Sequence, residues 1–89
     1  MSRTSRVGRC IADAREVRGE SLRSLAARCD VSHVYIAEIE RGKGASASKV
    51  IAIADALKID RADALQLWRL DRFDEIDAEV TRARKTVRR

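Results

Sequence analysis

The stretch from Ser21 to Gly42, SLRSLAARCDVSHVYIAEIERG, constrains the fold more than any other part of the chain. Its first half predicts a short helix over 22–29, and its second half predicts another that begins after Ser32. Serine is a good N-cap because its hydroxyl can accept a free backbone N–H in the first turn, and glycine readily takes the left-handed conformation that follows a last turn. The stretch therefore predicts two short helices joined by a tight turn.

The second of these helices has two different faces. Ile36 and Ile39 are three residues apart and point the same way, toward Leu25 of the first helix. The remaining positions face outward, where they are available to a ligand. These outward positions are His33, Val34, Ala37 and Glu38.

Composition extends the helical prediction to the whole chain. The 89 residues contain no proline and only four glycines, which favours helix nearly throughout, and no alternating strand pattern is present. Hydrophobic residues make up 45% of the chain but aromatic residues only 3%, so the core must consist of Ala, Val, Leu and Ile. A chain of this length forms one small domain with a thin core, which favours support from a partner subunit.

Three further helices are predicted around the central pair. Residues 6–18 form one, because apolar side chains recur at helical spacing until Gly19 ends the pattern. Ser46 caps the next helix and Asp60 the one after it. The apolar positions of these three helices are Val7, Ile11, Ala14, Val17, Val50, Ile53, Ala54, Leu57, Ala64, Leu65, Leu67, Trp68 and Leu70.

These residues resemble the phage-repressor-like helix-turn-helix family of the Cro and repressor type. The resemblance rests on Ser21, Leu25, Ala26, Val31, Ser32, Ile36 and the IERGK segment at 39–43, and it extends roughly from Arg6 to Leu67. It implies a compact bundle of five helices that binds double-stranded DNA. It also implies an ion pair between Arg15, where the family usually has an arginine, and Glu40.

By the same resemblance, the base-reading positions are His33, Val34, Ala37 and Glu38. None of them is the Arg, Lys, Asn or Gln that makes the strongest base contacts. His33 can bond to a guanine edge, Val34 can contact a thymine methyl group, and Glu38 can accept from a cytosine amino group while repelling phosphate. For His33 the alternative is a solvent-exposed helix start.

Contacts to the DNA backbone are expected at the start of the 22–29 helix and along the glycine-rich basic turn after residue 40. Leu22 stands where the family commonly has a phosphate-binding glutamine, so one contact is missing. The turn has the alternative of being only a solvated basic loop, and Tyr35 the alternative of ring packing. The phosphate-binding candidates are Ser21, Arg23, Tyr35, Arg41, Lys43, Ser46, Ser48 and Lys49.

The segment 71–89 has a different pattern, with apolar residues spaced by three and four and with acidic residues at its start and basic residues at its end. It predicts an additional C-terminal helix that pairs antiparallel with a second copy and forms a homodimer. Folding back on its own domain and nonspecific DNA binding by its basic end are the alternatives. The predicted dimer contact consists of Trp68, Leu70, Phe73, Ile76 and Val80.

Residues 1–5 are predicted to be a flexible basic arm, either a frayed end or one whose Arg3 and Arg6 reach DNA. The formal net charge of +5 is compatible with a nucleic-acid ligand. No apolar run is long enough to cross a membrane or to act as a signal peptide, which predicts a cytoplasmic, nucleoid-associated protein. Cys10 and Cys29 are expected to be half-buried thiols, with a disulfide as the alternative.

The predicted function is a sequence-specific DNA-binding transcriptional regulator, a small dimeric autoregulator or repressor that binds an inverted repeat. The alternative is a protein-interaction module, such as an antitoxin or anti-activator, that keeps the fold but reads DNA weakly or not at all. Leu22, Val34 and Glu38 favour this alternative, and it requires a protein partner. No acid–base, nucleophilic or metal-ligand cluster is evident, so neither an enzyme nor a cofactor or metal is predicted.

Overall fold

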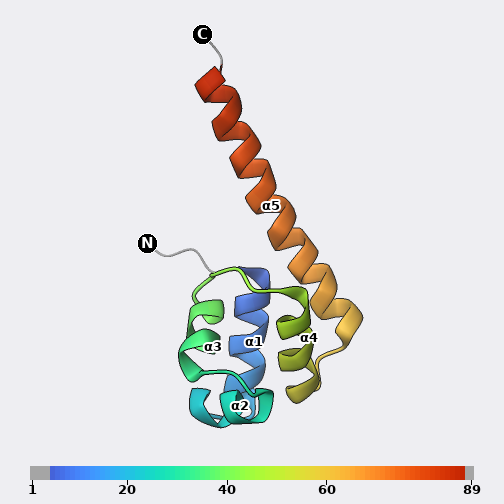
Figure 1. Ribbon diagram of the computed structural model, residues 1–89. Coiled ribbons are helices and arrows are strands. Elements are labelled where there is room, and N and C mark those ends of the chain that lie inside the picture. Colours follow the sequence, from blue (N-terminus) through green and yellow to red (C-terminus); the bar gives the residue numbers. More distant parts are fainter. Residues whose placement is uncertain (1–4, 88–89) are drawn as a thin grey trace.

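The computed structural model describes the backbone of residues 5–87 and the side chains of residues 5–84. Within this range the chain forms five helices and no strand: α1 (Arg6–Val17), α2 (Leu22–Cys29), α3 (His33–Glu40), α4 (Ala47–Ala56) and α5 (Arg61–Val87). The first four helices surround a common core, and α5 runs across the bundle and out of it (Figure 1). The prediction of an all-α bundle of five helices is confirmed.

Local side chains start most of these helices. The hydroxyl oxygens of Ser5, Ser21, Ser32 and Ser46 accept from the backbone N–H three residues later, at distances of 2.8 to 3.3 Å. Asp60 does the same for Asp63 at the start of α5. Each bond satisfies an N–H that the helix itself leaves without a partner, which is why these helices begin where the serines predict.

Left-handed backbone conformations close the helices. Gly19 follows α1 with a φ of 67° and Gly42 follows α3 with a φ of 105°. Glycine takes these conformations without steric cost, as the sequence indicated. Asp30, with a φ of 57°, makes the tight turn between α2 and α3.

The core contains aliphatic side chains from all five helices. Leu25, Ile36, Ile39, Val50 and Ile53 are the largest fully buried residues, and Val7, Ile11, Ala26, Ala54, Leu57 and Ala64 surround them. The predicted packing of Ile36 and Ile39 against Leu25 is confirmed. Val17 continues the apolar spacing of α1, but its side chain is 88% exposed, because it lies about 80° around the helix axis from buried Val7.

The C-terminal part of the chain differs from the prediction. The separate sixth helix expected from residue 71 is not present, because α5 continues unbroken from Arg61 to Val87. Neither glycine nor proline occurs in this segment, so nothing in the sequence interrupts the helix. At 1.5 Å per residue the 27 residues of α5 span about 40 Å.

This projection elongates the molecule. Its dimensions are 52 × 27 × 21 Å and its Cα radius of gyration is 14.7 Å, against about 12 Å for a compact chain of this length. The first half of α5 packs on α4 and α1, whereas its far half extends beyond the bundle (Figure 1).

A carboxylate from α5 attaches this helix to the start of α1. The two oxygens of Asp71 accept from the backbone N–H groups of Arg6 and Val7, each at 3.0 Å. The Arg6 guanidinium adds contacts to Asp71 and to Asp74, the latter at 2.7 Å. Arg6 therefore belongs to this junction, and Ser5 caps α1 instead of lying in a loose arm, while Arg3 and the rest of 1–4 lie outside the described residues.

Candidate nucleic-acid interface

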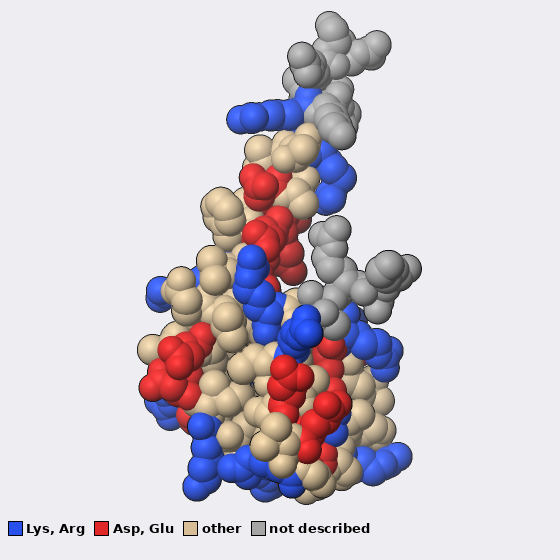
Figure 2. All heavy atoms as spheres, turned by 180° about the vertical axis from the view of Figure 1, so that it is seen from behind, with Lys and Arg blue, Asp and Glu red and all other residues tan. Residues whose placement is uncertain are grey.

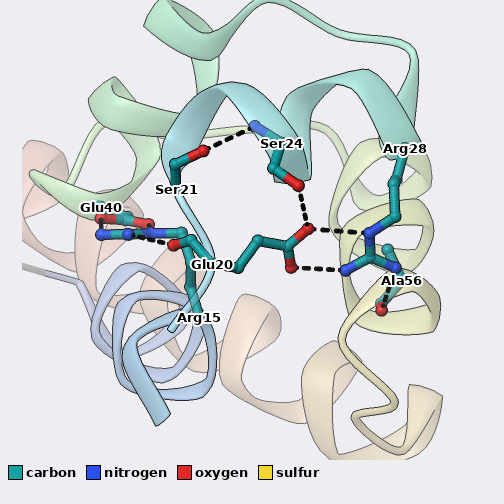
Figure 3. A network of polar contacts seen from close by, with 7 residues as sticks. All are labelled: Arg15, Glu20, Ser21, Ser24, Arg28, Glu40 and Ala56. Carbon is teal, nitrogen blue, oxygen red and sulfur yellow. Dashed lines mark hydrogen bonds and ion pairs between the residues drawn. The ribbon is translucent and has the colours of Figure 1, made fainter. Parts of the chain in front are cut away.

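A network of polar contacts fixes α2 and α3 in position (Figure 3). Arg15 of α1 binds Glu40 at the end of α3 through two hydrogen bonds, Nε to Oε2 at 2.7 Å and Nη2 to Oε1 at 3.0 Å. Its Nη1 donates to the carbonyl oxygen of Glu20 at 2.9 Å. Both charged side chains are mostly buried, so this two-bond ion pair holds α3 against α1 and confirms the predicted pairing.

The same network continues to α4 through Glu20. Its carboxylate accepts from Arg28 of α2 at 2.6 and 2.9 Å and from the hydroxyl of Ser24 at 2.9 Å. Arg28 also donates to the carbonyl oxygen of Ala56, the last residue of α4. These hydrogen bonds lower the pKa of Glu20 to about 2, and the bond from Arg28 has the largest effect.

The predicted base-reading side chains lie together on α3. Val34 is 52% exposed, and His33, Ala37 and Glu38 are half-buried. They lie on the face of α3 that turns away from buried Ile36 and Ile39. The helix thus presents a short mixed surface with one imidazole, two small apolar groups and one carboxylate.

Glu38 is not a free carboxylate within the chain. Its Oε1 lies 3.5 Å from Nζ of Lys43, in the turn that follows α3. A predicted base-reading residue and a predicted phosphate-binding residue are therefore in contact. This ion pair offsets part of the repulsion that Glu38 would exert on a phosphate.

Seven of the eight phosphate candidates lie on two segments, and the eighth, Tyr35, lies on α3. Ser21 and Arg23 are exposed at the start of α2, where free N–H groups and the helix dipole favour an anion. The other segment is the turn after α3 and the start of α4, where Ser46 and Ser48 share a hydrogen bond of 3.3 Å. The exposed candidates of this second segment are Arg41, Lys43, Ser46, Ser48 and Lys49.

Contacts from α5 hold this second segment. The indole nitrogen of Trp68 donates to the carbonyl oxygen of Ala45 at 2.7 Å. A groove of about 590 Å³ separates the turn from α5, and Tyr35, Lys43 and Trp68 are among its lining residues. Tyr35 is half-buried and packs against the core. Trp68, predicted to contact a partner subunit, instead packs against its own domain.

The two cysteines are both half-buried free thiols, as expected. Burial raises the pKa of the Cys10 thiol and of the Cys29 thiol. Among the residues that the structure describes, no cluster of three His, Cys, Asp or Glu side chains is arranged to hold a metal ion. Within the same residues, no helix has the length and apolar character needed to cross a membrane.

A sequence-family model described as a helix-turn-helix domain matches residues 6–67, which include all of α1 to α4 and the start of α5. The chain belongs to the helix-turn-helix family. The resemblance to the repressor-type family is thereby confirmed, and with it the assignment of α2 and α3 as a DNA-binding motif of the kind found in transcription regulators.

A solved structure supports the same assignment for nearly the whole chain. The chain is similar to the clp gene regulator ClgR from Corynebacterium glutamicum, with 26% sequence identity and a TM-score of 0.62. The alignment covers 92% of this chain and 89% of ClgR, so the likeness extends beyond the helix-turn-helix motif into α5. No curated protein matches the chain by sequence.

Sequence reasoning missed several residues that position this surface. Glu20 and Arg28 orient α2, Asp71 binds the start of α1, and Trp68 holds the turn after α3. Glu20 and Arg28 are eight residues apart, and Glu20 lies outside the helix that contains Arg28, so helical spacing does not predict their contact. The partners of Asp71 and Trp68 lie 65 and 23 residues away, beyond the reach of any local pattern.

Proposed function

We propose that this helix-turn-helix protein is a sequence-specific transcriptional regulator that binds an inverted-repeat operator as a homodimer. The observation that carries this proposal is the face of α3, where His33, Val34, Ala37 and Glu38 lie together beside two exposed basic segments. A helix that reads bases needs this arrangement, because contacts to phosphates fix its register while side chains in the major groove select the sequence.

The flanking segments are suited to the DNA backbone. Lys43 and Lys49 are exposed on either side of the α4 N-terminus, and Ser21 and Arg23 occupy the start of α2. The network of Arg15, Glu20 and Arg28 holds α2 and α3 rigidly, which preserves the spacing between phosphate contacts and base contacts. Rigid elements hold a binding geometry better than loops do.

The test is a selection from a pool of random duplexes, followed by titration of the selected and a scrambled duplex at low and physiological salt. We expect Lys49→Ala to weaken binding to both duplexes by a similar factor and to reduce the salt slope by about 1. Lys49 is preferred to Lys43 for this purpose because Lys43 also pairs with Glu38. Arg9→Ala, an exposed cation on the outer side of α1 beside Cys10, is the matched control and should leave binding unchanged.

Substitutions on α3 should act differently. His33→Ala and Glu38→Gln are expected to change the preference among sequences by about 1 to 3 kcal/mol at single base pairs. If no duplex is selected and all duplexes bind equally weakly, the proposal fails. The outward face of α3 would then be assigned to a protein partner, as in an antitoxin or anti-activator.

A further inference from the structure

The far half of α5 carries an apolar stripe that the domain leaves uncovered. Phe73, Ile76 and Val80 are 65%, 47% and 46% exposed, although each is a large apolar side chain on a regular helix. With Ala83 they fall within an arc of about 80° around the helix axis. Trp68 and Leu70 lie about 100° to either side of the centre of that arc, so the stripe is narrower than the sequence predicted.

Among the described residues, some of the charged side chains beside this stripe form ion pairs within the chain and others do not. Asp71 and Asp74 bind Arg6 of the same chain, and Glu75 binds Arg72. Asp77 and Arg84, by contrast, have no ion-pair partner among the described side chains. Both lie along the same edge of the stripe, seven residues apart.

We propose that the stripe binds the same stripe of a second copy of this chain, with the two α5 helices antiparallel and the twofold axis near Val80. Residues equally far before and after Val80 then meet. Ile76 meets the region of the partner's Ala83, and Asp77, three residues before the axis, meets the partner's Arg84, four residues after it. On the edge that carries Asp77 and Arg84, the apolar pattern and the charge pattern therefore share one centre.

The distribution of charge along α5 favours this direction. Over 71–79 acidic residues outnumber basic ones five to one, whereas the charged side chains described beyond residue 79, Arg82 and Arg84, are basic (Figure 2). A parallel pair would bring acidic beside acidic and basic beside basic. An antiparallel pair places each acidic segment next to the basic segment of its partner, so that Asp77 faces the oppositely charged Arg84 on the same edge of the partner.

This arrangement also separates the two bundles by a distance that suits DNA binding to an inverted repeat. This part of the inference rests on the proposed function. Leu70, in the part of α5 that still lies on its own bundle, precedes Val80 by ten residues, so the two copies of this position are about 30 Å apart along the pair. Two recognition helices that read adjacent major grooves on one side of a duplex are about 34 Å apart. The two distances are close enough for both bundles to contact one inverted repeat.

The first experiment measures self-association without DNA, by sedimentation equilibrium of the full chain over a range of concentrations. Val80→Asp is expected to raise the dimer dissociation constant about tenfold or more, because each dimer loses two buried valines and gains two charges. Thr81→Asp adds the same charge one residue along, about 120° from the centre of the stripe, and should change the constant little. Circular dichroism checks that both variants remain helical.

The second experiment tests direction and register. Asp77→Arg and Arg84→Asp should each weaken self-association, because each places like charges opposite one another in both halves of the dimer. An equimolar mixture of the two variants should regain association at least as strong as that of the original chain, since every cross-pair is then Arg opposite Asp. In a parallel pair, position 77 of the first variant would face the partner's Arg72, and mixing would not restore association.

The inference is overturned if the chain stays monomeric, if Val80→Asp and Thr81→Asp behave alike, or if the mixture associates no better than either variant. Because no DNA is present, these outcomes are independent of whether the chain reads a sequence. A monomer that still selects one duplex would leave the proposed regulator intact and remove only the dimer arrangement. A dimer that selects no duplex would leave the dimer arrangement intact and remove the proposed regulator.

Discussion

Gly8 is the residue on which the packing of α1 against α3 depends most directly. A Cβ atom built at this position would collide with the carbonyl oxygen of Ile39 and lie 2.9 Å from Oγ of Ser5. Backbone atoms at a helix end cannot move aside as a flexible side chain can. The last turn of α3 therefore lies as close to α1 as a glycine permits.

We expect Gly8→Ala to destabilise the protein by about 1 to 3 kcal/mol, as overpacking usually does. Alanine would ordinarily favour a helix over glycine by about 1 kcal/mol, so the collision must outweigh that gain. Chemical denaturation measures the free energy of unfolding.

The control for this prediction is Gly44→Ala. A Cβ there would lie 3.3 Å from Oε2 of Glu75, the end of a flexible side chain that can shift. Its free energy of unfolding should stay within about 0.5 kcal/mol of that of the original chain. Equal stability of the two variants would contradict the close approach at Gly8.

Among the helices, α2 is held by the polar contacts of Glu20 as well as by its buried face. Glu20 lies in the linker between α1 and α2, and its carboxylate binds Arg28, which in turn binds the end of α4 (Figure 3). Hydrogen bonds from the Arg28 guanidinium, the larger cause, and from the Ser24 hydroxyl lower the pKa of Glu20 from an ordinary 4.5 to about 2. The bond between the two side chains therefore persists well below neutral pH.

This shift predicts how the stability of the protein depends on pH. Because the pKa of Glu20 is lower in the folded chain than in the unfolded chain, the ionised carboxylate stabilises the fold in full above about pH 4.5. This stabilisation is lost progressively as the pH falls toward 2. We expect Glu20→Gln to reduce the decline in the free energy of unfolding across that interval. Denaturant titrations at several pH values measure the difference.

Glu16→Gln provides the comparison for Glu20→Gln. The Glu16 side chain is 68% exposed and has only a long contact of 3.9 Å to Arg15. Its substitution should leave the pH dependence of stability close to that of the original chain. If the two variants show the same pH profile, the Glu20 contact with Arg28 does not contribute to stability in solution.

At the scale of the whole molecule, α5 is one helix with two environments. Its first half packs on α4 and α1, and Asp71 and Asp74 fix it to Arg6. Beyond residue 74 every described side chain is exposed. An isolated helical end of this kind has few tertiary contacts to oppose fraying.

Hydrogen exchange should reveal this division. In dilute solution the amides of 76–84 are expected to exchange much faster than those of 62–70, and at concentrations that favour a dimer they should slow down. The Val80→Asp variant should keep fast exchange at every concentration. Slow, concentration-independent exchange over 76–84 in the original chain would mean that the projecting helix is stable by itself.

Sequence patterns predicted the parts of the structure that depend on residues close together in the chain. Ser21, Ser32, Ser46 and Asp60 each cap a helix through a bond to a residue three positions later. Such a bond needs no partner from elsewhere in the fold, so sequence is sufficient. Family resemblance extended this reach to one long-range contact, the pair of Arg15 and Glu40.

Local patterns and the family resemblance were thus sufficient to predict the helical class, the helix-turn-helix motif and the outward face of α3. Three features depend on how the helices pack and could not be predicted: Asp71 binds the start of α1, Trp68 bonds to Ala45, and Val17 is exposed. The tertiary structure also showed α5 as a single helix whose far half projects from the bundle. Spacing specifies which side of a helix is apolar, but which neighbour covers that side depends on how the helices pack in three dimensions.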